Sequence, residues 1–75
     1  MEVFDNEMKV RINGELKDIH GTLKLSELLN SLNLKSNGIA VELNKEVVSK
    51  EKWEHLALSE GDTIEIVHFV GGGSN

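Results

Sequence analysis

The stretch LSELLNSLNL, residues 25–34, carries leucines at the spacing of an amphipathic helix. Leucines at i, i+3, i+4 and i+7 share one face, which predicts a helix of about two to three turns. Glu27 suits the positive N-terminal end of this helix, although no ideal capping residue stands three positions earlier. The segment KSNG at 35–38 predicts the stop, at Asn37 or Gly38. The leucine stripe, which needs an apolar surface to cover, consists of Leu25, Leu28, Leu29 and Leu32.

The segments before the helix predict a β-hairpin. KVRI at 9–12 alternates charged and apolar residues, and the Asn-Gly pair that follows is a strong hairpin signal. A two-residue loop would place Ile12 opposite Glu15 and put unlike residues on one face. We therefore expect a three-residue loop that pairs Ile12 with Leu16. Ile19 then falls out of phase, which predicts that the second strand bulges or ends near this residue.

The segments after the helix predict three more strands. IAVELN at 39–44 alternates, NKE turns the chain, and the two valines after it form a short return strand. The connector SKEKWEHLAL at 49–58 has room for one helical turn and contains Trp53, the single tryptophan. SEGD then turns the chain into TIEIVHFV at 63–70, the last strand.

This order of elements predicts an α+β domain, a mixed sheet of about four to five strands covered on one face by one helix. We expect the first and last strands side by side in the middle of the sheet, because they are its most apolar members. The chain would then run from a rigid central strand into residues 71–75, a flexible glycine-rich tail. We assign the domain to residues 8–70 and residues 1–7 to a leader or a lead-in, with Met1 and Met8 as equally suitable starts. The strand residues expected to face the leucine stripe are Val10, Ile12, Val41, Leu43, Ile64 and Ile66.

Composition limits the classes of function. A chain of 75 residues with 39% hydrophobic and 28% charged residues suits one small soluble domain. It has no cysteine, which excludes disulfides, thiolate metal sites and a thiol nucleophile. No apolar run approaches the roughly 20 residues of a membrane helix, and no signal peptide is recognisable, so we expect a cytoplasmic protein. The net charge of −5 argues against a nucleic-acid partner and permits a basic protein partner, although it also keeps a small domain in solution.

The sequence offers no self-contained catalytic or metal site. The three histidines, His20, His55 and His68, lack ligand-like spacing, so we expect no metal. His68 continues the inward phase of the last strand and is expected to be partly buried or to contact a partner. The glycine run lacks the lysine and hydroxyl residue of a phosphate loop, and no helix follows it.

One group of residues does not fit a solvated exterior. In the last strand Val67 and Phe69 face away from the core at the base of the glycine tail, and Ala40 shares that outward face. Single exposed apolar residues are common, whereas a cluster beside a terminus favours a protein-docking surface. Three glycines without Cβ atoms can pass through a channel too narrow for other residues. The residues alone nevertheless leave open whether the tail is a frayed end without a role.

The segments VRINGE, LSELLNSLNL, IAVELNKEVV and GDTIEIVHFVGGG together resemble the ThiS family, the ubiquitin-like sulfur carrier proteins of thiamin biosynthesis. The resemblance covers residues 8–73, and GDTIEIVHFVGGG is its most specific part. It implies the β-grasp fold, which agrees with the order of elements. It also implies that the protein is a carrier and not an enzyme. Such a carrier is a co-substrate of activating and sulfur-transfer enzymes and binds no cofactor itself.

In such a carrier a ThiF-like enzyme uses ATP and magnesium to adenylate the carboxylate of the C-terminal glycine. Sulfur from a persulfide then displaces AMP, and a ThiG-like thiazole synthase takes the sulfur from the resulting thiocarboxylate into the thiazole ring. By position, the resemblance makes Gly71, Gly72 and Gly73 the tail that enters the partner enzymes. It places the attachment at Gly73, with Gly72 as the less favoured alternative. The docking residues, taken from the resemblance and the outward-facing pattern, are Val67, Phe69, Val70 and Ala40.

Two residues depart from the pattern of the family. Members of this type end in the glycines, whereas Ser74 and Asn75 follow here. Because some related carriers lose such residues to a metalloprotease, we predict that Ser74 and Asn75 are removed to leave Gly73 as the terminus. An artificial extension and a relative that is not activated are open alternatives. So are a carrier for another pathway (molybdopterin, cysteine or a secondary metabolite) and a non-covalent β-grasp binding module with an inert tail. The final sulfur acceptor and the oligomeric state also stay open.

Overall fold

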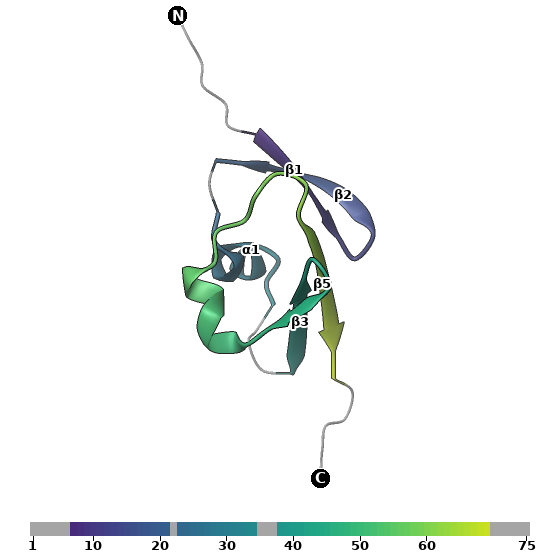
Figure 1. Ribbon diagram of the computed structural model, residues 1–75, viewed down its shortest axis with the longest axis vertical. Coiled ribbons are helices and arrows are strands. Elements are labelled where there is room, and N and C mark those ends of the chain that lie inside the picture. Colours follow the sequence, from purple (N-terminus) through teal and green to yellow (C-terminus); the bar gives the residue numbers. More distant parts are fainter. Residues whose placement is uncertain (1–6, 22, 35–37, 70–75) are drawn as a thin grey trace, which may run out of the picture.

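The computed structural model describes residues 7–21, 23–34 and 38–69. Its elements are β1 (Glu7–Ile12), β2 (Glu15–His20), α1 (Leu25–Ser31), β3 (Ile39–Leu43), β4 (Glu46–Val48), the 3-10 helix η1 (Lys50–His55) and β5 (Thr63–His68). The strands form one mixed sheet in the order β2-β1-β5-β3-β4, in which only β1 and β5 are parallel. Helices α1 and η1 lie on one side of this sheet (Figure 1). The first and last strands are adjacent in its middle, as the sequence predicts.

The hairpin of β1 and β2 differs from the prediction in its loop. Asn13 and Gly14 alone form the turn, with φ values of 49° and 87°, and Ile12 lies opposite Glu15. A two-residue loop with positive φ at both positions fits the right-handed twist of the flanking strands. This backbone preference outweighs the matching of like side chains, so the expected three-residue loop is wrong. Leu16 faces away from the core and is exposed.

Strand β2 is also more regular than the sequence predicts. It continues to His20 with one-to-one pairing, so the expected bulge or early end at Ile19 is wrong. The observed register brings Ile19 to the inward face, where it is buried. Glu15 and Lys17 share that face but lie at the edge of the sheet, where both are exposed and their charged groups lie 3.5 Å apart. An edge strand can therefore carry charged residues on its inward face at little cost.

Helix α1 begins with a bond that compensates for the missing capping side chain. The backbone N–H of Lys24 donates to Oε1 of Glu27 over 2.8 Å. The first N–H groups of a helix have no partner within the helix, and a glutamate at the third helical position commonly reaches back to this place. Glu27 thus anchors the helix start, and its charge also suits the positive end of the helix dipole.

The helix ends earlier than predicted. Asn33 adopts a left-handed conformation with φ of 60°, and its N–H donates to the carbonyl oxygen of Asn30 over 3.0 Å. The N–H of Leu34 donates to the carbonyl oxygen of Leu29 over the same distance. These two bonds are those of a Schellman motif, in which asparagine can replace the usual glycine. The stop expected at residues 37–38 is therefore wrong.

The core lies between the sheet and the two helices. Trp53 of η1 is 6% exposed, and its Nε1–H donates to the carbonyl oxygen of Val48 over 3.1 Å, which confirms the helical turn expected in the connector. Leu32 follows the end of α1 and is 38% exposed, so it is not the core residue that its spacing predicts. Leu43 is only partly buried. The buried cluster consists of Val10, Ile12, Ile19, Leu25, Leu28, Leu29, Ile39, Val41, Trp53, Leu58, Ile64 and Ile66.

Candidate functional site

The outward side of β5 carries an apolar cluster, which we call the docking face. Val67 and Phe69 are 54% and 62% exposed. Ala40 of β3 lies directly opposite Val67 in the sheet. The N–H of Phe69 donates to the carbonyl oxygen of Gly38 over 2.8 Å, so the antiparallel pairing continues one residue beyond β5. The docking face, defined by Ala40, Val67 and Phe69, is therefore held by backbone hydrogen bonds up to its last residue.

The strand beneath the docking face is firmly supported. Ile64 and Ile66, on the opposite side of β5, are buried in the core. Strand β1 ends at Ile12, opposite Ile64, while β5 runs on past the hairpin (Figure 1). Asn13, the first residue after β1, continues the contact with β5 through two hydrogen bonds. Its N–H donates to the carbonyl oxygen of Ile64 over 2.9 Å, and its Oδ1 accepts from the N–H of Ile66 over 2.7 Å.

Two glutamates adjoin the docking face. Glu42 of β3 and Glu65 of β5 lie directly opposite each other, two residues from the Ala40–Val67 pair on both strands. Residues two apart on a strand share one face of the sheet, so these carboxylates lie next to the apolar cluster. No lysine, arginine or histidine forms an ion pair with either of them in the described part of the chain.

The charges on the β1–β2 side of the same sheet face are arranged differently. Nζ of Lys9 lies 2.8 Å from Oδ1 of Asp18. The hydrogen bond and the charge of Lys9 hold the pKa of the Asp18 carboxyl below its ordinary value, and Asp18 in turn raises the pKa of Lys9. Both side chains are about half exposed, so this pair contributes little to the free energy of unfolding. Among the described residues, Glu42 and Glu65 thus have no ion-pair partner, although Arg11 lies on the same face of the sheet, opposite Thr63 in the adjacent strand.

The structure brings together three of the predicted docking residues, Ala40, Val67 and Phe69. Val70 and the tail residues Gly71, Gly72 and Gly73 lie outside the described residues, as do Ser74 and Asn75. His68 is exposed at the end of β5, opposite Ile39, so the expected partial burial is wrong and contact with a partner stays a prediction. The closeness of Glu42 and Glu65 was missed, because alternation gives the face of each residue but not its neighbour across strands.

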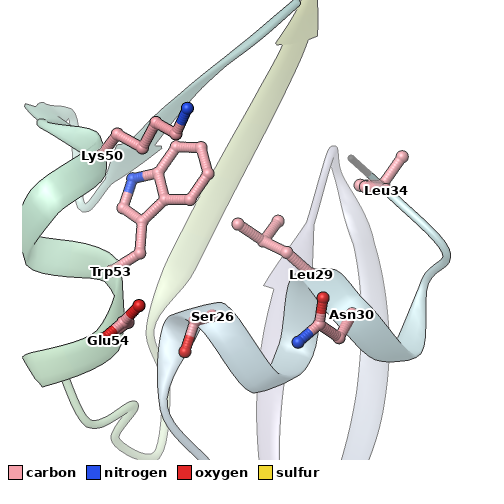
Figure 2. A pocket seen from close by; sticks show the side chains of 7 residues that line it. All are labelled: Ser26, Leu29, Asn30, Leu34, Lys50, Trp53 and Glu54. Atoms are coloured by element: carbon pink, nitrogen blue, oxygen red, sulfur yellow. The ribbon is translucent and has the colours of Figure 1, made fainter. Parts of the chain in front are cut away.

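The part of the chain that the structure describes has cavities but no candidate metal site. They contain no group of three metal-ligating side chains, and no helix among them is long and apolar enough to cross a membrane. A cavity of about 220 Å³ lies between α1 and η1, where Trp53 faces Leu29 and Lys50 extends beside the indole (Figure 2). This cavity lies on the helical side of the sheet, away from the docking face, and is smaller than the roughly 300–1,000 Å³ of usual ligand pockets. A second cavity of about 400 Å³, lined by residues that include Val47, Lys52 and Leu56, lies within that range.

The chain is similar to proteins of one family in sequence and in fold. The ThiS family model matches residues 10–73. The sulfur carrier protein ThiS of Bacillus subtilis is 42% identical over 65 residues, which cover 85% of this chain and 98% of that protein. A crystal structure of the thiamine biosynthesis protein ThiS from Geobacter metallireducens superposes with a TM-score of 0.77 at 33% identity, covering 88% of this chain and all of that one. That match confirms the predicted β-grasp fold.

A second kind of relative is much longer. The thiazole synthase of Paramagnetospirillum magneticum is 41% identical over 68 residues, which cover 91% of this chain but 21% of that protein. The thiazole synthase of Magnetococcus marinus matches to the same extent. This chain thus spans about a fifth of the length of the two synthases. The family match over residues 10–73, the identity to the Bacillus protein along nearly its whole length and the shared fold together show that the chain belongs to the ThiS family.

Proposed function

We propose that this chain is a sulfur carrier of thiamin biosynthesis and acts in the cytoplasm as a co-substrate of other enzymes. The observation that carries the proposal is the docking face on the central strand β5, in a member of the ThiS family. In the sequence, only Phe69 and Val70 separate this strand from three glycines. A partner that binds Ala40, Val67 and Phe69 would therefore receive the following residues at a defined place.

The chemistry proposed for the tail takes place at a main-chain carboxylate. A carboxylate is a poor electrophile, so a ThiF-like enzyme first joins the Gly73 carboxylate to the α-phosphorus of ATP, releasing pyrophosphate and leaving an acyl adenylate. Magnesium and ATP are bound by that enzyme. The terminal sulfur of a persulfide then attacks the acyl carbon, and AMP leaves. A thiol reduces the resulting acyl disulfide and releases the carrier as a thiocarboxylate.

A ThiG-like thiazole synthase is the proposed acceptor of this sulfur. The two relatives named thiazole synthase support this partner, because each contains a segment similar to this chain. A segment in the same chain as an enzyme meets that enzyme at a high effective concentration, which favours transfer between the two. In the present carrier, binding through the docking face would replace that covalent link.

The proposal requires that Ser74 and Asn75 be removed, by a metalloprotease as in related carriers. Intact mass spectrometry tests this requirement together with the function. The full chain and a form ending at Gly73 are incubated with a ThiF-like enzyme, ATP, magnesium and a persulfide donor. We expect only the shorter form to gain the mass of one oxygen replaced by sulfur. If the form ending at Gly73 acquires neither sulfur nor an adenylate, the carrier function is wrong.

The substitution Gly72→Val tests the role of the glycines. A β-branched side chain should prevent entry into a narrow channel of the partner, because only glycine lacks a Cβ atom. We expect thiocarboxylate formation to stop while the midpoint of thermal unfolding stays the same. A clearly lower midpoint would mean that residue 72 packs against the domain, contrary to the proposed role of the tail.

The residues after the glycines give some weight to a second function. Ser74 and Asn75 fit a sulfur carrier of another pathway, one that supplies molybdopterin, cysteine or a secondary metabolite. The two functions share the thiocarboxylate and differ in its acceptor. Transfer of sulfur from the loaded carrier to a thiazole synthase, and not to a synthase of another pathway, would decide for thiamin biosynthesis.

A further inference from the structure

The docking face and the Glu42–Glu65 pair form one continuous surface. The register places Ala40 opposite Val67 and Glu42 opposite Glu65, two residues further along both strands. Like charges directly opposite each other in antiparallel strands destabilise a sheet. A side-chain choice made for stability alone would not place two glutamates here, so their position indicates a role outside this chain.

Covering the apolar cluster has a consequence for these carboxylates. Glu42 is already half-buried, and Glu65 neighbours Val67 on the same face. A partner that excludes water from Val67 and Ala40 must also remove water from at least part of the glutamate pair. Burying a carboxylate without a compensating charge is strongly unfavourable. A purely apolar partner surface therefore does not fit this face.

We propose that the ThiF-like enzyme that activates the C-terminal carboxylate places a basic side chain, best an arginine, between Glu42 and Glu65. The planar guanidinium has donors on two edges and can bind two carboxylates at once, whereas a lysine offers a single point of charge. The same arrangement speeds encounter, because the net charge of the carrier is −5 and attracts a basic surface. This inference rests on the proposed function and adds the chemistry of the partner surface to it.

Removing the charges of Glu42 and Glu65 should change the stability of the carrier and its docking in opposite directions. In the double variant Glu42→Gln/Glu65→Gln the repulsion between the two carboxylates disappears, so the midpoint of thermal unfolding should rise or stay the same. Docking should weaken, because neutral amides attract a guanidinium less. A matched control is Glu51→Gln/Glu54→Gln, which changes the net charge equally at two exposed positions of η1 on the helical side of the sheet.

The experiment measures pyrophosphate release by a ThiF-like enzyme with ATP and magnesium, using carriers that end at Gly73. At low ionic strength we expect kcat/KM to fall about tenfold for the Glu42/Glu65 variant, mainly through KM, and less than about twofold for the control. Added salt should narrow the difference between wild type and the first variant. Equal kcat/KM for the two double variants would overturn the proposal.

Failure of the inference and failure of the proposed function look different in this assay. If the wild-type carrier is adenylated and the two double variants behave alike, the carrier function stands and the basic contact is wrong. If the wild-type carrier ending at Gly73 is not adenylated, the function is wrong, and the inference that rests on it falls too.

Discussion

Replacing Asn13 separates two contributions that a single residue makes to the fold. Asn13 adopts a left-handed conformation in the hairpin turn, with φ of 49°. Its Oδ1 also accepts the N–H of Ile66, at the point where β5 has run past the end of β1. Ile66 precedes the docking face, so this bond bears on both stability and function.

The size of each effect follows from the structure. Residues other than glycine, asparagine and aspartate destabilise the fold by about 1 kcal/mol when they adopt the left-handed conformation. A half-buried N–H without a partner costs about 1–3 kcal/mol. Asn13→Ala suffers both losses, so we expect its free energy of unfolding to fall by about 2–4 kcal/mol. A domain of 75 residues has roughly 4–11 kcal/mol in total, so this loss is large.

Two further substitutions separate the contribution of the turn conformation from that of the lost hydrogen bond. Asn13→Gly keeps the turn and removes the acceptor, and should cost about 1–3 kcal/mol. Asn13→Asp keeps both the acceptor and a tolerated left-handed residue, and should cost less than about 1 kcal/mol. Asn33→Gly is the matched control: Asn33 is also left-handed, with φ of 60°, but its side chain forms no hydrogen bond among the described residues. That change should be neutral or slightly stabilising.

Urea denaturation measures these differences, and amide hydrogen exchange shows where they arise. For Asn13→Gly we expect the unfolding midpoint to fall by about 1–2 M urea with an unchanged slope. The amide of Ile66 should exchange faster, while amides in α1 should follow only the change in global stability. If Asn13→Gly is as stable as wild type and the Ile66 amide keeps its protection, the Oδ1 bond does not support β5 and the reasoning is refuted.

Three other predictions concern the core, the surface charges and the docking face. Trp53→Phe should lower the free energy of unfolding by about 1–3 kcal/mol, because the carbonyl oxygen of Val48 loses its donor and the smaller ring leaves an unfilled space. Denaturation experiments measure this loss, and an unchanged stability would mean that the Nε1 bond is unimportant. NMR titration should show the pKa of Asp18 below its ordinary value, so the small stabilisation by its ion pair with Lys9 is present at neutral pH and disappears as the pH falls through that lowered pKa. Lys9→Ala should return the pKa of Asp18 toward its ordinary value, and a persisting shift would rule out the ion pair as its cause. Phe69→Ser should leave the thermal midpoint nearly unchanged, because the ring is 62% exposed, but should slow adenylation; a large loss of stability would show that Phe69 belongs to the core.

Much of the fold could be predicted because its signals are local. The helix, the strands and the inward faces of β1, β3 and β5 follow from spacing within a few residues. The inward face of β2 did not follow, because Leu16, expected opposite Ile12, is exposed and Ile19 is buried. The docking face followed as well, since Val67 and Phe69 are exposed as their alternation with Ile64 and Ile66 predicts. The exact end of the helix did not follow. Several residues after the leucines can adopt the left-handed conformation, and the hydrogen bonds that end the helix form around Asn33.

The hairpin shows why matching of side chains is a weak guide at an edge. The expectation that Ile12 pairs with Leu16 assumed that every inward position must be apolar. Strand β2 lies at the edge of the sheet, where Glu15 keeps contact with water even on the inward side. The geometry of the Asn-Gly turn was then free to set the register.

Most elements, the faces of the central strands and the family could be predicted from the sequence, because periodicity and motif are properties of neighbouring residues. The meeting of residues from different strands became visible only in the folded domain. The fold places Ala40 against Val67, Glu42 against Glu65, and Oδ1 of Asn13 on the N–H of Ile66. These contacts join positions that are 27, 23 and 53 residues apart along the chain. Strand order and register bring them together, and no local pattern encodes either one.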